Sequence, residues 1–276
     1  MRGTGDWMAR YPFRSRWLAG TSDRAECRLH YIDEGEGDPL IFVHGPATWS
    51  FHWRELILAF RGRYRTIALD YAGCGLSGLP GPGYRYRPED RIRELTRLIR
   101  RLGLRQVTLI ADGVAMVTAL GVAAKISRRV ARFVLINPIW PSLQNRYGLP
   151  ILPRIPWRIL TSPERAIPGG ETDPTIRRGY TEPWIRWRRR CGLWRELCGW
   201  RRSVREPGYL ASLRRRSSVF SGYPACLICG ETELLSDLLF VRPEVHVIPE
   251  VVDPVETIPL RLEPILESFF ERNPVF

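Results

Sequence analysis

Residues 106–125 read QVTLIADGVAMVTALGVAAK, which is an apolar run, a break at Asp112 and Gly113, and a second, longer apolar stretch. The first run is short and bounded by turn residues, and this pattern predicts a buried strand. The stretch 114–125 is long enough for a helix. The chain is therefore expected to pass from a strand into a helix within two residues.

The same alternation extends to both sides of this stretch. Further strand-like runs lie at residues 28–33, 39–43, 64–70, 132–136, 225–229 and 244–248. Helical patterns lie at 88–102 and 257–271, and the first of these gathers Ile92, Leu95 and Ile99 on one face. This order predicts an α/β fold with a mostly parallel sheet flanked by helices.

The alternation stops between residues 138 and 223. This stretch is rich in Pro, Trp and Arg and has no strand pattern. We interpret it as a helical lid inserted into a core made of residues 1–137 and 224–276. The lid is expected over the carboxyl ends of the strands, where open α/β sheets bind ligands.

The chain is strongly basic, with a formal net charge of +13, and Lys125 is its only lysine. The arginine excess indicates either an anionic partner or a compositional bias with solvated charge. Nucleic acid is not favoured, because no recognition helix or RNA-binding motif is present. No stretch of 18 residues lacks charge and the first residues have no apolar run, so we expect a cytoplasmic protein.

Residues 182–200 predict one helix of the lid. The apolar face contains Trp184, Trp187, Cys191, Trp194 and Cys198, and the arginines largely off this face are Arg186, Arg188, Arg189, Arg190 and Arg195. An interfacial helix on an anionic membrane surface has this pattern. The alternative, which we favour, is a lid helix that packs its tryptophans onto the core.

The cysteines predict no metal site. Cys226 and Cys229 form a C-x-x-C inside the strand-like run 225–229, and no second Cys or His pair lies at ligand spacing. We therefore expect buried free thiols, and no cofactor is predicted.

Several segments, taken in order, resemble one family. They are His44-Gly45, residues 48–51, Asp70, residues 73–77, 102–104, 107–110, 134–137 and 227–231, Val245-His246 and Pro249. The order is similar to the haloalkane dehalogenases, and most similar to their relatives, the bacterial β-lactone decarboxylases of long-chain olefin synthesis. The likeness covers residues 11–270 and implies the α/β-hydrolase fold.

The resemblance also implies an aspartate nucleophile on the strand-to-helix turn, within a His-Asp-Trp pattern. Ungapped, Asp112 falls on the family's His, Gly113 on its nucleophile and Val114 on its Trp. Ala111 and Ala115 supply the small residues that such a turn needs on either side of its tip. The alternative centre, Asp112, would crowd the turn and require an insertion, so we favour Gly113, which has no side chain to attack with.

The other slots that the resemblance implies are altered as well. The catalytic histidine slot holds Asp253, or Val252 in the other register, and the anion-holding Asn and Trp are replaced by Pro46 and Val114. Glu233 alone retains the residue type that the resemblance implies, because it places a carboxylate at the position of the family's catalytic acid. His44, Gly45, Pro46, Trp49 and Val114 are the candidate binding residues around the site. The histidines near the expected site are assigned other roles, since His44 is expected to order its loop and His52 begins a helix.

The sequence thus predicts an α/β-hydrolase-fold protein that has lost hydrolase or dehalogenase activity. Asp112, Gly113, Glu233 and Asp253 mark the former catalytic positions. An apolar pocket under the lid is expected to bind a hydrophobic small molecule or a protein partner. Two alternatives stay open, namely an active hydrolase rearranged around Asp112, and a membrane-surface binder that works through the basic lid.

Overall fold

The computed structural model describes residues 6–19, 27–138, 173–205, 212–213, 215, 217–230, 240–249 and 254–275. Within these residues eight strands form one sheet, in the order β1-β2-β4-β3-β5-β6-β7-β8. Their bounds are β1 Arg16–Leu18, β2 Leu29–Glu34, β3 Pro39–Val43, β4 Arg65–Leu69, β5 Val107–Asp112, β6 Val130–Ile136, β7 Ala225–Cys229 and β8 Glu244–Val247. β2 pairs antiparallel with both of its neighbours, β1 and β4. The remaining pairings, along the sheet order β4-β3-β5-β6-β7-β8, are all parallel.

The expected mostly parallel sheet is confirmed, and each strand-like run of the sequence forms one of its strands. The central strands β3 and β5 are buried along almost their whole length, which explains why they read as continuous apolar runs. β1 was not expected from the sequence. It has three residues and only Leu18 is buried, so it is too short to show an alternating pattern.

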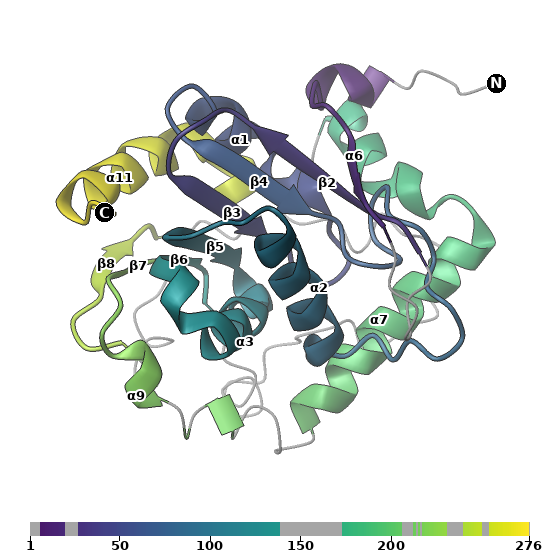
Figure 1. Cartoon of the computed structure of the whole chain (residues 1–276). Coiled ribbons are helices and arrows are strands. Elements are labelled where there is room, and N and C mark those ends of the chain that lie inside the picture. The colour runs from purple at the N-terminus through teal and green to yellow at the C-terminus, as the bar shows by residue number, and fades with distance from the viewer. Residues whose placement is uncertain are drawn as a thin grey trace.

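Helices cover both faces of the sheet (Figure 1). α2 (Pro88–Arg101) and α3 (Met116–Ile126) pack on one face, and α1 (Arg54–Phe60) and α11 (Pro259–Arg272) on the other. The expected helices at 88–102, 114–125 and 257–271 are thus present with small shifts of their ends. Short helices α9 (Ser217–Phe220) and α10 (Pro254–Thr257) lie before β7 and α11.

The described part of the expected lid contains α6 (Pro174–Thr181), the 3₁₀ turn η6 (Glu182–Trp184), α7 (Trp187–Arg205) and the short helix α9. The indole N–H of Trp49 donates to the Gly179 carbonyl at 3.1 Å, and Arg189 donates to the Gly75 carbonyl at 2.9 Å. Trp49 and Gly75 follow the carboxyl ends of β3 and β4. α6 and α7 therefore contact the loops at the edge where the lid is expected. The bounds 138–223 stay a prediction.

The single helix expected at 182–200 is instead divided, since η6 ends at Trp184 and α7 starts at Trp187. The buried face of α7 consists of Leu193, Glu196, Leu197 and Trp200, which are spaced by three and four residues. Trp194, assigned to the apolar face from sequence, is 40% exposed. The helical phase differs because Trp184 belongs to the preceding turn. The side chain of Trp187 lies outside the described set.

No helix among the described residues has the length and apolarity needed to cross a bilayer.

Candidate functional site

A sharp turn joins β5 to the 3₁₀ turn η3 (Gly113–Ala115), from which α3 continues. Asp112 is extended, with φ −107°, and Gly113 has φ +56°, in the left-handed region where a side chain is strained. Ala115 is fully buried beneath the helix start. Gly113 is therefore the residue with a left-handed backbone at the strand-to-helix turn, and Asp112 precedes it.

The Asp112 side chain is 24% exposed, and its Oδ2 lies 3.2 Å from Nε2 of His52. His52 belongs to the 3₁₀ turn η2 (Ser50–Trp53) and is almost completely buried. Its other ring nitrogen, Nδ1, lies 2.9 Å from the hydroxyl of Tyr180 in α6. The site thus contains an aspartate–histidine contact that links the turn after β5 to the helix α6.

The contacts continue from Tyr180 to a buried ion pair. The Tyr180 hydroxyl donates to Oε2 of Glu256 at 2.7 Å, and Arg54 donates to both oxygens of that carboxylate. Burial disfavours the charged carboxylate, but the hydrogen bonds from Arg54 and Tyr180 outweigh it and lower the pKa of Glu256.

These contacts determine which atom donates in each of the hydrogen bonds that join His52, Tyr180 and Glu256. Because the hydroxyl proton of Tyr180 is directed to ionised Glu256, its oxygen accepts from Nδ1–H of His52. Nε2 of His52 lies on the other side of the ring, 3.2 Å from Oδ2 of Asp112. His52 therefore links Asp112 at the strand-to-helix turn to Tyr180 of α6.

His44 orders the loop after β3, as expected from the sequence. Its Nδ1–H donates to the Gly45 carbonyl at 2.8 Å, and its Nε2 accepts the Tyr71 N–H at 3.3 Å. Burial, with the nearby Arg91 charge, lowers the pKa of His44 to about 3. The ring is therefore neutral with both nitrogens in use, and it holds the loop in place.

The candidate binding residues surround the turn in different ways. A Cβ added to Gly45 would lie 4.0 Å from the carbonyl oxygen of Asp112, so the His-Gly loop runs beside the turn. Pro46 and Val114 are half-buried and their side chains carry no N–H donor. Trp49 is fully buried, stacks on Phe51 and gives its N–H to Gly179. It therefore acts in packing.

A close approach explains the glycine in α6. A Cβ at Gly179 would lie 2.2 Å from the Phe51 ring, so only glycine lets the helix reach this depth. This contact positions Tyr180, the next residue, against His52.

Glu196 of α7 enters the core near the same loop. Its carboxylate accepts the Ala47 N–H at 3.2 Å and the Cys74 thiol at 3.3 Å, and it forms an ion pair with Arg91. The two charged side chains are 2% and 3% exposed. A buried pair with these hydrogen bonds anchors α7 to the loops after β3 and β4.

His30 is used elsewhere in the core. Its Nδ1 lies 2.9 Å from Oδ2 of the fully buried Asp70, which also accepts the backbone N–H groups of Ser50 and Leu76. Burial opposes ionisation, but the His30 contact and these bonds outweigh it and lower the pKa of Asp70. The motif residue Asp70 therefore orders loops and does not reach the turn at Gly113.

Of the four catalytic positions named from sequence, the structure describes Asp112 and Gly113, and Glu233 and Asp253 lie outside the described residues. Sequence reasoning gave no part in the site to Tyr180 or Glu256 and only a minor one to His52. These residues are separated from Asp112 by 60 or more positions. No spacing pattern in the sequence relates them, because their proximity depends on how α6 and α10 pack.

The fold agrees with comparisons to known proteins. The family model described as alpha/beta hydrolase fold matches residues 38–159. The crystal structure of a haloalkane dehalogenase from Agrobacterium tumefaciens C58 superimposes with a TM-score of 0.73 at 19% identity, covering 94% of this chain and 96% of that one. The chain is therefore an α/β-hydrolase-fold protein.

Sequence comparison finds two kinds of similar protein. Haloalkane dehalogenase 2 of Mycobacterium tuberculosis is 38% identical over 133 residues, which cover 48% of this chain and 45% of that protein. The cis-3-alkyl-4-alkyloxetan-2-one decarboxylase of Xanthomonas campestris pv. campestris is 25% identical over 288 residues, covering 90% and 93%. The chain is thus similar to dehalogenases and β-lactone decarboxylases, although the more identical match spans less than half of the relative's length.

Proposed function

We propose that this protein does not perform the covalent chemistry of a hydrolase, and that it acts as a non-catalytic α/β-hydrolase-fold protein. The observation that carries the proposal is Gly113 at the tip of the turn after β5, with φ +56°. In α/β hydrolases the nucleophile occupies this sharp turn, exposed above the sheet. Glycine fits the backbone there but supplies no atom that could attack a substrate.

The histidines support the same proposal. The chain has four, and three of them bond away from the turn, namely His30 to Asp70, His44 to its own loop and His246 to Glu244. A general base needs access to the proton that it removes. His52 lies near the turn, but it is about 1% exposed and is held between Asp112 and Tyr180.

The loop after β3, which would hold an anion, lacks free hydrogen-bond donors at two neighbouring positions. Pro46 cannot donate from its ring, and the neighbouring Ala47 N–H is directed to the Glu196 carboxylate. Removing one such donor from an enzyme costs about 100- to 1,000-fold in rate. Because the Ala47 N–H already has the Glu196 carboxylate as its acceptor, it is not free to stabilise an oxyanion or a leaving halide.

The test is a gain of function. Wild-type protein is expected to turn over haloalkanes, β-lactones and simple esters no faster than buffer does. The variant Gly113→Asp, Val114→Trp, Pro46→Asn, Asp253→His restores the family's residue types and is expected to recover activity. A folded variant without activity means that the lid or the loops also close the site, whereas wild-type turnover would contradict the proposal.

A non-catalytic protein of this fold is expected to bind a hydrophobic ligand under its lid. A thermal-shift screen against long-chain acyl compounds tests this. Binding to the folded state raises the melting temperature in proportion to the logarithm of ligand concentration. A flat response over the whole series would favour a protein partner instead.

The contact between Asp112 and His52 favours one second candidate, an active hydrolase rearranged around Asp112. In that reaction the Asp112 carboxylate would displace a leaving group, and His52 would then help water to hydrolyse the resulting ester. Replacing His52 with Gln would trap the ester. Intact-protein mass spectrometry of His52→Gln after incubation with substrate would then show an adduct that Asp112→Asn removes.

A further inference from the structure

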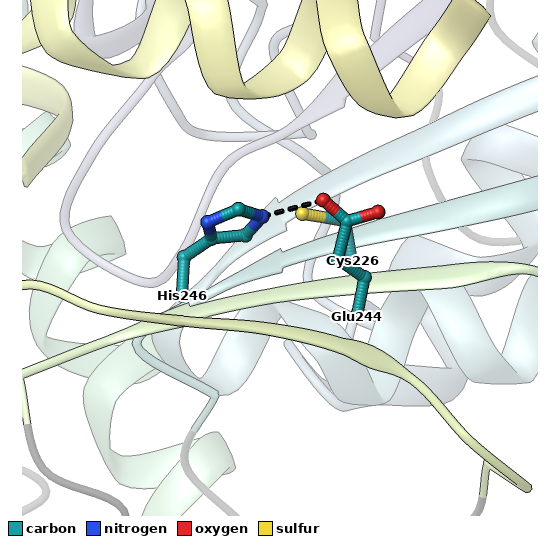
Figure 2. Close-up of side chains that lie close together, drawn as sticks. All are labelled: Cys226, Glu244 and His246. Atoms are coloured by element: carbon teal, nitrogen blue, oxygen red, sulfur yellow. Dashed lines mark hydrogen bonds and ion pairs between the residues drawn. The ribbon is translucent and has the colours of Figure 1, made fainter. Parts of the chain in front are cut away.

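Three side chains that can bind a metal ion meet at the edge of the sheet, on β7 and β8. The parallel pairing places Cys226 opposite Glu244 and Ile228 opposite His246. Residues opposite each other, and residues two apart on one strand, point to the same face of a sheet. Cys226, Glu244 and His246 therefore gather on the face that α11 covers, as Figure 2 shows.

The ligand atoms of these three residues all lie within 4.8 Å of one another. Nε2 of His246 is 2.6 Å from Oε1 of Glu244, and the Cys226 sulfur lies beside the same carboxylate (Figure 2). Tetrahedral Zn²⁺ holds thiolate, imidazole and carboxylate ligands about 3.4–3.6 Å apart, given its bond lengths. The ligand atoms are thus within about 1.5 Å of the separations that a tetrahedral ion requires.

We propose that Cys226, Glu244 and His246 bind a divalent transition-metal ion of the Zn²⁺ type. A thiolate and an imidazole favour zinc or cobalt over calcium or magnesium, which prefer all-oxygen sites. Three protein ligands leave a fourth position for water or another ligand. The site is separate from the turn at Gly113, so metal binding here does not depend on the proposed function.

The burial of the three residues suits such a site. Cys226 is fully buried, whereas the Glu244 and His246 side chains are 25% and 31% exposed, so an ion can enter from solvent. On binding, the ion replaces the thiol proton of Cys226, which leaves to water, and the neutral imidazole of His246 carries its one proton on Nδ1 while Nε2 faces the ion. The resulting charges of thiolate, carboxylate and ion cancel.

Arg272 of α11 is the competing cation. Its guanidinium donates to Oε1 of Glu244 and to the Ser268 hydroxyl. Burial disfavours ionisation of Glu244, but the bonds from Arg272 and His246 outweigh it and lower its pKa. A bound metal ion would stabilise the Glu244 carboxylate in place of these hydrogen bonds, and Arg272 would remain on the outer side of the carboxylate.

The test is titration of the full-length, reduced protein with Co²⁺, a spectroscopic probe of zinc sites. We expect one equivalent to produce a thiolate-to-cobalt charge-transfer band that Zn²⁺ abolishes. The band is expected to be lost in Cys226→Ala. His246→Ala should lose at least about 100-fold in affinity, since even outer-shell changes cost 10- to 100-fold.

Cys229→Ala is the matched control, because Cys229 lies on the same strand and odd-numbered spacing directs it to the other face. It is expected to keep the band. Arg272→Met should tighten binding by about twofold to fivefold, the size of a surface charge effect. A missing band in the folded wild type, or a band that survives Cys226→Ala, would overturn the proposal.

Discussion

The Nε2 atom of His52 lies 3.2 Å from Oδ2 of Asp112, although 60 positions separate the two residues in the chain. Because the contact joins the loop after β3 to the turn after β5, we expect it to stabilise the fold. His52→Ala would leave Asp112 and Tyr180 each without this partner and should cost about 1–3 kcal/mol. Urea denaturation measures the change.

A double-mutant cycle with Asp112→Ala separates the pair from its surroundings. Residues in direct contact show coupling energies of about 0.5–3 kcal/mol. His52→Gln, which keeps a donor and an acceptor, should be milder than His52→Ala. Strictly additive effects of His52→Ala and Asp112→Ala would mean that the contact contributes nothing to stability.

The ion pair between Arg91 and Glu196 should hold α7 in place. Glu196→Ala leaves the guanidinium charge buried without its partner, and we expect a loss of about 3–5 kcal/mol. Arg195→Ala, at the exposed neighbouring position of the same helix, is the control and should change stability by less than about 0.5 kcal/mol. Equal effects of the two substitutions would contradict this role for Glu196.

Glu94 of α2 should make stability depend on pH. Burial raises the pKa of its carboxyl to about 7, from the ordinary value of 4.5, against the hydrogen bond from the Ala72 N–H. Between these two values the folded state holds a proton that the unfolded state has lost. Stability contributed by this group is therefore complete below pH 4.5 and is lost as the pH rises through 7.

Glu94→Gln cannot ionise, so it should be more stable than the wild type at pH 8 by about 1–3 kcal/mol. The difference should vanish below pH 4.5, where the wild-type group is protonated in both states. Urea denaturation across this range measures it, and Glu271→Gln on α11 provides an exposed control. A constant difference at every pH would show that ionisation of Glu94 is not its cause.

If residues 182–200 form an interfacial segment, the alternative to the packing role, their exposed side should bind anionic membranes. Trp194 and Ile185 are 40% and 52% exposed, and Arg186, Arg188 and Arg195 are exposed near them in the chain. The protein is expected to sediment with phosphatidylserine vesicles at low ionic strength, and salt should release it. Trp194→Ala should weaken binding, whereas Trp17→Ala, also exposed, should not. No sedimentation at low salt would leave α7 with a packing role alone.

The sheet could be predicted from the sequence because its inner strands are buried on both sides and therefore read as apolar runs. Sequence places Gly113 at the turn because Ala111 and Ala115 meet a local steric requirement there, and the φ of +56° at Gly113 is a conformation that suits glycine. The buried face of α7 could not be predicted from the sequence. Glu196 is charged, and it is buried because Arg91, more than 100 positions away, pairs with it.

The same limit explains what was missed at the sites. His52, Tyr180 and Glu256 meet through the packing of three separate helical segments. Cys226 lies near His246 because of the register between β7 and β8, which ligand spacing along one chain does not reveal. Local chemistry could be predicted from sequence, and side chains brought together by tertiary packing could not.

The rate of substrate turnover, measured side by side for the wild type and Asp112→Ala, tests the central claim most directly. Loss of one member of a nucleophile–base unit typically lowers the rate by orders of magnitude. With Gly113 at the turn, both proteins should leave haloalkanes, β-lactones and simple esters to react at the buffer rate. Robust turnover by the wild type that Asp112→Ala abolishes would contradict the account and establish an enzyme rearranged around Asp112.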